Sequence, residues 1–559
     1  MGRQKKPVTA AAPAAPDHLT TRLFAPGMSA LHRAGLGGLA CTLKYIERAY
    51  RQGALSDDDV PGGPWADPDV PPWTIEPDHI TLRFGAAGNA REFLKRLYAL
   101  GFTLADDMIH LPAQHRMPPT AGIRADLQLG ITLTFLQHGK TRALAKVPTV
   151  ANHDPEGTGV PAVTVEYRAC SGFRHQTDWE DLIDPKTGRL TDKPVGIEGP
   201  LNPGATVRHI AYTAATQVDD PVERLLPLHF ALVGCVALPV NRGVGVLLVP
   251  EVEDVVAFAK ARPFLTPAKP REGFVSGGAD AALQMQVRLK AQKLGMTACH
   301  AVTFRPTAWA SQQKSRVHTV HVPVLAGADL DVYDIALAHL PPRIVTRTEK
   351  ESTGKGRTKV TTERQVAFRT DSVVRPLIAD NLATGRRWYA GFTRLMTATN
   401  PATDKPFRDA VRFEQRGLHA MVTDSRAWAD HEADRLVVQA VHEAIGRRLG
   451  QIRKETDGES AKVLSQATKN RWERFRERLR LDLAGAKTEA HVRFALMDLF
   501  SRAGANTVLR AGWATMLPVV RTDWQLARDL GLLALSSYAG RSAEDTPPDT
   551  TKPEPTAEE

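Results

Sequence analysis

The first long run of patterned residues predicts a helix that begins after a turn at Pro26 and Gly27. Ser29 stands where it can cap this helix, because its hydroxyl can accept from a free amide of the first turn. The apolar side chains that follow share helical spacing and would form one buried face: Leu36, Leu39, Leu43, Ile46 and Tyr50. Three glycines lie among them: Gly35, Gly37 and Gly38. Glycine weakens a helix, so its presence here predicts that another backbone packs closely on this face.

From residue 80 to residue 261 the pattern changes repeatedly between strand and helix. Alternation of apolar and polar positions predicts strands over 80–84, 127–135, 163–169, 205–215 and 243–249. Helical spacing predicts helices over 90–100 and 253–261. The most apolar stretch, 225–240, contains prolines and is shorter than the ~20 residues of a membrane helix, which favours buried strands. The irregular order of these elements indicates an α+β fold, not a doubly wound parallel sheet.

Residues 343–369 read as a long basic β-hairpin. This segment holds eight lysines and arginines against three glutamates, and β-forming residues flank a Gly-Lys-Gly tip. One interpretation is a solvated charged loop; the other is a finger that grips a phosphate backbone. The cations that we expect to contact nucleic acid here are Lys355, Arg357, Lys359 and Arg364.

The composition becomes helical from about residue 372. One predicted helix, within 469–486, has an apolar face made by Trp472, Phe475, Leu479 and Leu483. It also carries five arginines within ten residues, more than solubility requires. A solvated face that Glu473 and Glu477 partly neutralise is the alternative to phosphate contact. The candidates for contact are Arg471, Arg474 and Arg478.

These patterns divide the chain into four parts. We expect a disordered leader over 1–19, an α+β domain over 20–371, a helical bundle over 372–540 and a disordered acidic tail over 541–559. The end of the bundle, 522–540, includes a helix that is apolar nearly all round and therefore buried.

Charge and cysteine content narrow the function. The 559 residues include 72 Lys+Arg and 62 Asp+Glu, a formal net charge of +10 that favours a polyanionic partner. The four cysteines form no CxxC pair, so neither a zinc knuckle nor a redox dithiol is expected. No apolar signal-peptide core is present at the N-terminus. We expect a soluble, cytoplasmic protein without a metal site, a cofactor or a membrane anchor.

No catalytic constellation emerges from the sequence. The dinucleotide-binding pattern fails at Leu248, the phosphate-loop pattern at Gly356, and two zincin-like starts at Arg435 and Gly446. The sequence therefore predicts no catalytic residue and no enzyme. Two alternatives stay open: a metal-independent nuclease that processes RNA, and a free-standing basic DNA-binding protein. The first would use His32, His300 or His442 as a general acid or base.

Three segments resemble a known family. Residues 24–43, FAPGMSALHRAGLGGLACTL, are similar to the opening of the large subunits of type I CRISPR surveillance complexes (Cascade), in their Myxan-type branch. Residues 386–396, RRWYAGFTRLM, resemble a Trp-Tyr…Gly-Phe motif of that family, and residues 513–539 resemble its closing helix. The motifs bracket nearly the whole chain, but they are structural and carry no binding residue.

The resemblance implies a non-catalytic subunit of an RNA-guided complex. Its partners would be a guide RNA (crRNA), double-stranded target DNA with its displaced strand, the other Cascade subunits and a trans-acting helicase–nuclease. Such subunits help recognise the short motif beside the target, promote strand opening and carry a helical bundle along the displaced strand. Guide pairing would read the sequence, so the protein would need few groove contacts beyond clamps on the backbone.

Overall fold

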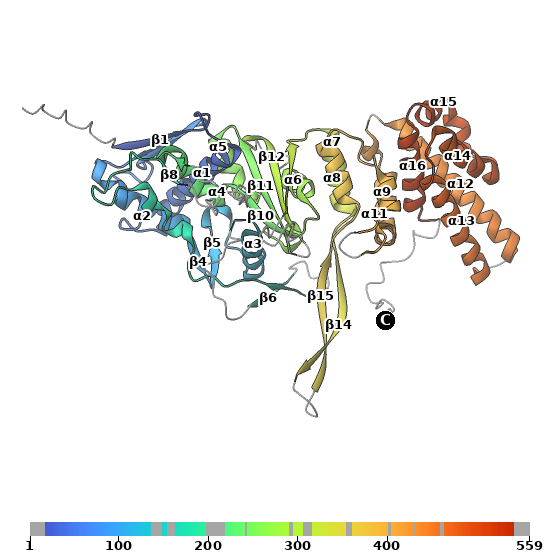
Figure 1. Ribbon diagram of the computed structural model, residues 1–559, viewed down its shortest axis with the longest axis horizontal. Coiled ribbons are helices and arrows are strands. Elements are labelled where there is room, and N and C mark those ends of the chain that lie inside the picture. Colours follow the sequence, from blue (N-terminus) through green and yellow to red (C-terminus); the bar gives the residue numbers. More distant parts are fainter. Residues whose placement is uncertain are drawn as a thin grey trace, which may run out of the picture.

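The structure is a computed structural model in which an α+β body, a long hairpin and a helical part follow one another along the molecule (Figure 1). It describes residues 17–135, 148–153, 162–196, 219–240, 243–289, 294–305, 316–353, 360–400, 404–429, 431–458 and 463–540. Among these residues, no helix combines the length and apolar character that a membrane crossing requires.

Two helices cross at the centre of the body: α1 (Ala30–Arg51) and α4 (Val222–Gly234). Ser29 caps α1 as predicted, accepting from the backbone N–H of His32. A Cβ atom on Gly35 would lie 1.9 Å from the carbonyl oxygen of Pro227, and one on Gly38 would lie 2.2 Å from that of Phe230. The predicted close backbone is therefore confirmed for Gly35 and Gly38, and α4 supplies it. Gly37 instead makes room for the ring of Phe258 in the helix at 255–261.

The main sheet of the body is antiparallel, in the order β10-β11-β12-β13. Its strands are β10 (Val236–Val240), β11 (Val244–Val252), β12 (Met296–Arg305) and β13 (Arg316–Pro323). The helices that pack on it include α1, α3 (Ala121–Thr134) and α6 (Gly278–Val287). Further helices of this region are α2 (Ala90–Gly101), α5 (Val255–Ala261) and α7 (Ala328–His339).

Smaller sheets complete the body. A three-stranded sheet joins β1 (His18–Arg22), β3 (His79–Arg83) and β2 (Trp73–Ile75). Two short antiparallel pairs are β4 (Thr103–Ala105) with β5 (Met108–His110), and β8 (Val195–Gly196) with β9 (Asp219–Asp220). The strands predicted near 80, 163 and 244 and the helices near 90 and 255 are all present.

Two sequence predictions in the body are wrong. The segment 127–135 belongs to helix α3, not to a strand, since Thr120 caps it and Leu127 and Ile131 lie one helical turn apart on its buried side. The apolar stretch 225–240 is a strand only over β10; its first half lies in α4, which continues through Pro227. Burial against α1 outweighs the local cost of that proline. The strand expected over 205–215 lies outside the described residues.

The predicted basic hairpin is present. Strands β14 (Arg343–Thr353) and β15 (Val360–Thr370) pair antiparallel along their full length and extend away from the body (Figure 1). At its root, β15 continues into a sheet with β7 (Val163–Glu166) and β6 (Thr149–Asn152).

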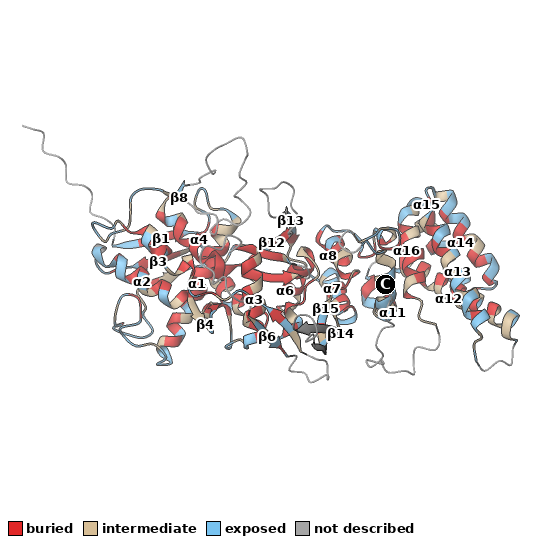
Figure 2. Ribbon diagram, turned by 60° about the horizontal axis from the view of Figure 1, so that its bottom comes forward, coloured by how far each residue is buried: buried red, intermediate tan, exposed pale blue. Residues whose placement is uncertain are grey.

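The rest of the chain is helical. It comprises α8 (Arg375–Ala383), α9 (Phe392–Thr397), α10 (Phe407–Val411), α11 (Gln415–Thr423), α12 (Glu432–Asp457), α13 (Gln466–Ala484), α14 (Glu489–Ala503), α15 (Thr507–Thr522) and α16 (Trp524–Ser537). Helix α16 is buried over most of its length, as predicted, and packs against α12, α13 and α14 (Figure 2). An α+β body with a basic hairpin and a C-terminal helical region therefore matches the predicted fold class.

Candidate nucleic-acid interface

The hairpin presents the first candidate surface. Lys355, Arg357 and Lys359 belong to its tip, which lies outside the described residues. Arg364 lies in β15, where its backbone pairs in register with Glu349; its side chain is outside the described part of the structure. The structure therefore confirms the strand that carries Arg364, and the contacts of these four cations stay a prediction.

The root of the hairpin carries arginines stacked on aromatic rings. The guanidinium of Arg347 lies 5.3 Å from the ring centroid of Phe368, and that of Arg343 lies 4.4 Å from Phe413. Phe368 is 37% exposed and Phe413 is 56% exposed. Aromatic faces beside cations suit the bases and phosphates of a single strand. Sequence reasoning missed this pairing, because Phe413 comes from the segment after α10, far along the chain.

Helix α13 presents the second candidate surface. Ser465 caps it by accepting from the backbone N–H of Thr468 at 3.1 Å, and the indole N–H of Trp472 donates to the carbonyl of Leu449 at 3.0 Å. The apolar face that the sequence predicted packs into the core, with Leu479 and Leu483 buried. Packing of that face turns the polar side of the helix outward.

The three predicted arginines of α13 lie together. All three line a groove of about 270 Å³ between α12, α13 and α14, to which Arg448 and Arg502 also contribute. Asp482 and Asp498 are the acidic residues of its lining. Five arginines and two aspartates line this groove, and Arg502 pairs with Asp498 at 2.8 Å, so the lining keeps a net positive charge. Two of the five arginines come from neighbouring helices that the sequence pattern did not connect to α13.

Existing contacts differ among the three arginines. Arg471 is held by Glu455, with 2.7 Å between guanidinium and carboxylate, and by the hydroxyl of Thr456 at 2.6 Å. Hydrogen bonds from Arg448 and Arg471 lower the pKa of Glu455, so this carboxylate stays ionised. Arg478 approaches Asp482 only to 3.8 Å. Arg474 and Arg478 are exposed and carry most of the charge that the groove can offer to a ligand.

The histidines considered for catalysis occupy three different surroundings. His32 is 8% exposed; its ring contacts Ser29 through Nδ1 and Asp220 through Nε2, the latter at 2.9 Å. Burial lowers its pKa, against the opposing effect of Asp220. In this setting His32 ties the start of α1 to the strand before α4.

His442 is packed against α16, where its Nε2 lies 2.9 Å from the carbonyl oxygen of Ala534 and 3.0 Å from the hydroxyl of Ser537. Burial lowers the pKa of His442 to about 4. The ring of His442 therefore belongs to the packing of α12 against α16.

His300 is the most accessible of the three. Its Nε2 lies 2.5 Å from a carboxylate oxygen of Glu251, and the ring of His321 lies 5.2 Å away. In the described parts of the chain, no group of three or more histidine, cysteine or carboxylate side chains is arranged to hold a metal ion. The four cysteines are buried, and desolvation raises the pKa of Cys41 and of Cys235 to about 12.

Comparison with known proteins finds one family model that matches the N-terminal part of the chain and another that matches the C-terminal part. Residues 20–229 match the family model of the DevT N-terminal domain, and residues 425–559 match that of the DevT C-terminal domain. The chain is 34% identical over 557 residues to "CRISPR-associated protein Cas8a1/Csx13" of Myxococcus xanthus (strain DK1622). That alignment covers 95% of this chain and 90% of the relative.

Proposed function

Because this chain belongs to the Cas8a1/Csx13 family of Cascade large subunits, we propose that it is a non-catalytic subunit that binds guide RNA and target DNA. The observation that carries this proposal is the arginine-lined groove on α13. Arginine clusters of this kind gain affinity for phosphates by releasing condensed counterions and by donating paired hydrogen bonds. The formal net charge of +10 supports the same conclusion.

The two surfaces have different roles in this proposal. The hairpin, within the α+β domain of residues 20–371, binds the phosphate backbone of a duplex or of the guide through Lys355, Arg357, Lys359 and Arg364. In the helical bundle of residues 372–540, Arg471, Arg474 and Arg478 hold the displaced single strand. Neither surface needs to read bases, because pairing with the guide supplies the sequence specificity.

The proposed function also includes interactions with the target duplex and with other proteins. The subunit helps recognise the short motif beside the target, promotes opening of the duplex and recruits a separate helicase–nuclease. These roles place it in the cytoplasm with the other Cascade subunits. Its histidines take no part in cutting.

A charge reversal on the hairpin tests the proposal. In the assembled complex, the quadruple variant K355E/R357E/K359E/R364E should bind target DNA at least tenfold more weakly and with a shallower salt dependence. The matched control reverses four exposed arginines away from both surfaces: Arg386, Arg426, Arg493 and Arg521. Equal affinity of the hairpin variant and the wild type would overturn the assignment.

The nuclease alternative has its own test, for which His300 is the relevant residue since it pairs with Glu251 at a partly exposed site. The isolated chain, incubated with a repeat-containing precursor RNA in EDTA, should leave the RNA intact. Cleavage that disappears in the variant H300A would replace the proposed function with guide-RNA processing.

A further inference from the structure

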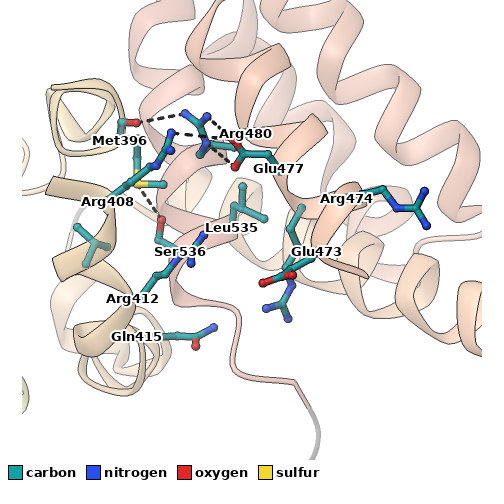
Figure 3. A pocket seen from close by; sticks show the side chains of 12 residues that line it. Met396, Arg408, Arg412, Gln415, Glu473, Arg474, Glu477, Arg480, Leu535 and Ser536 are labelled. Atoms are coloured by element: carbon teal, nitrogen blue, oxygen red, sulfur yellow. Dashed lines mark hydrogen bonds and ion pairs between the residues drawn. The ribbon is translucent and has the colours of Figure 1, made fainter. Parts of the chain in front are cut away.

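The side of α13 that faces away from the groove borders a second, larger cavity. Its volume is about 520 Å³, within the range of ~300–1,000 Å³ typical of small-molecule sites. Helices α9, α10, α11 and α16 and the short turn at Arg412–Glu414 border it together with α13, and one side opens to solvent (Figure 3). A cavity of this size accommodates one small ligand, not a folded partner.

Basic side chains dominate the polar part of the cavity. The arginines that line it are Arg408, Arg412, Arg474, Arg476 and Arg480, and the acidic residues are Glu473 and Glu477. Glu477 is occupied by Arg480, whose guanidinium donates to both of its carboxylate oxygens at 2.8 and 2.6 Å. Arg474 points away from the other side chains (Figure 3), and it also lines the groove. Arg408 approaches the carboxylates of Asp409 and Glu477 only to 3.8 and 3.9 Å. Against Glu473, the cavity therefore keeps an excess of positive charge from Arg408, Arg412 and Arg476.

Two of these arginines have donors that the protein does not satisfy. The Nε atoms of Arg408 and Arg476 are buried and have no hydrogen-bond acceptor among the described residues. Arg412 is exposed and has no ion-pair partner in the described part of the chain. The guanidinium groups of Arg412 and Arg476 also line the cavity, and an anion there would accept charge-assisted hydrogen bonds from them.

The opposite part of the cavity is apolar. Met396, Val411 and Leu535 line it and are almost fully buried. Beside them, the one acceptor of the Ser536 hydroxyl among the described residues is the thioether sulfur of Met396, at 3.3 Å. A thioether is a weak acceptor, so this hydroxyl can turn to a ligand at little cost. The ligand chemistry that fits is a phosphate attached to a flat, largely apolar group with polar edges.

We propose that this cavity binds a single nucleotide, with its phosphate on Arg412 and Arg476 and its base against Met396, Val411 and Leu535. The inference rests on the proposed function, in which the nucleotide is an unpaired one of the displaced strand, turned out beside α13. Helix α13 then holds the strand on both sides: its groove takes the backbone, and the cavity takes one base. A free mononucleotide has the same chemistry, and the experiment separates the two sources.

The test measures binding of two probes to the full chain. One probe is free AMP, followed by calorimetry. The other is a thymidine oligonucleotide with 2-aminopurine at regular intervals, whose fluorescence reports transfer of the base from solvent into a protein site. The variants are R412A, R412K and a control, R435A, which removes a half-buried arginine of α12 that pairs with Glu432 outside the cavity. A thermal melt of each variant verifies the fold.

The expected result is a change in 2-aminopurine fluorescence of about twofold at saturation, together with weak AMP binding. R412A should lower AMP affinity about tenfold and abolish the fluorescence change, since it removes a charge-assisted phosphate contact. R412K should restore part of both signals, and R435A should leave them unchanged.

Other outcomes are equally informative. Strand binding without a fluorescence change, and without AMP binding, overturns the nucleotide pocket but leaves the proposed function intact. AMP binding that depends on Arg412, without any strand binding, retains the pocket as a free-nucleotide site and removes the proposed strand-binding role. Signals that are equal in R412A and the wild type overturn the inference outright.

Discussion

Replacing Arg474 and Arg478 by alanine should weaken binding of single-stranded nucleic acid and leave the fold intact. Both side chains are exposed, and their present contacts are weak. Arg478 approaches a carboxylate only to 3.8 Å, and Arg474 donates to a backbone carbonyl of its own helix at 3.3 Å. Exposed pairs of this kind contribute between about 0 and 1 kcal/mol to folding, so the melting temperature should hardly change.

The size of the binding effect follows from counterion release. Each phosphate contact to a single strand contributes about 0.7 to the slope of log K against log salt, so two lost contacts reduce the slope by about 1.4. If the variant and the wild type bind equally at about 1 M salt, this difference in slope makes the variant bind about 14-fold more weakly near 0.15 M.

The assay is fluorescence anisotropy of a labelled single strand, titrated with the full chain over about 0.05 to 0.4 M KCl. The double variant R426A/R435A is the matched control, because it removes the same charge from sites outside the groove, one exposed and one half-buried. An unchanged slope for R474A/R478A refutes the groove as a strand site. An equal drop in both variants shows that net charge, not local contact, determines the affinity.

Three further predictions concern the fold. The variant G38V should destabilise the protein by at least about 3 kcal/mol in chemical denaturation, since its Cβ would lie 2.2 Å from the carbonyl oxygen of Phe230. His175 is fully buried, and its pKa is lowered to about 3 from 6.5, first by desolvation. Between pH 6.5 and pH 3 the unfolded state therefore binds one more proton at this residue than the folded state, and the free energy of unfolding falls as the pH falls below 6.5. Between about pH 7 and pH 5 this effect lowers the free energy of unfolding by on the order of 2 kcal/mol, and H175L should remove that decrease. The buried pair of Arg375 and Asp280 joins α8 to α6 at 2.6 Å, so R375A should cost about 3–5 kcal/mol in denaturant titration, and R375M/D280L considerably less.

Local patterns predicted the elements whose signals agree with each other. In α1, the cap at Ser29 and the helical spacing of leucines indicated a helix, and the glycines indicated a close backbone. Gly35 and Gly38 face the backbone of α4, whereas Gly37 faces the ring of Phe258. In α13, the apolar stripe and the polar face separated as the spacing indicated. Agreement between local and tertiary preferences makes such segments predictable.

The failures have physical reasons. In α3, alternating leucines and isoleucine match a strand, but Thr120 provides a cap and Gly130 allows the helix to approach Ala237 of β10. Only the tertiary context decides between these two patterns. In α4, burial against α1 overrides the local preference of Pro227.

The candidate site was predictable only in part. Helical spacing was enough to select the arginines of α13. The groove, however, also needs Arg448 and Arg502, and the cavity needs Arg408 and Arg412, all from other elements. Sequence periodicity contains no information about which helices become neighbours. The stacking of Arg343 on Phe413 at the hairpin root was missed for the same reason.

The most direct test of the central claim is co-purification. The chain is tagged and expressed with its neighbouring genes, and any bound RNA is sequenced. We predict a stoichiometric particle that contains RNA of uniform length with a repeat-derived handle. A lone monomer without RNA would contradict the account of this chain as a guide-bearing Cascade subunit.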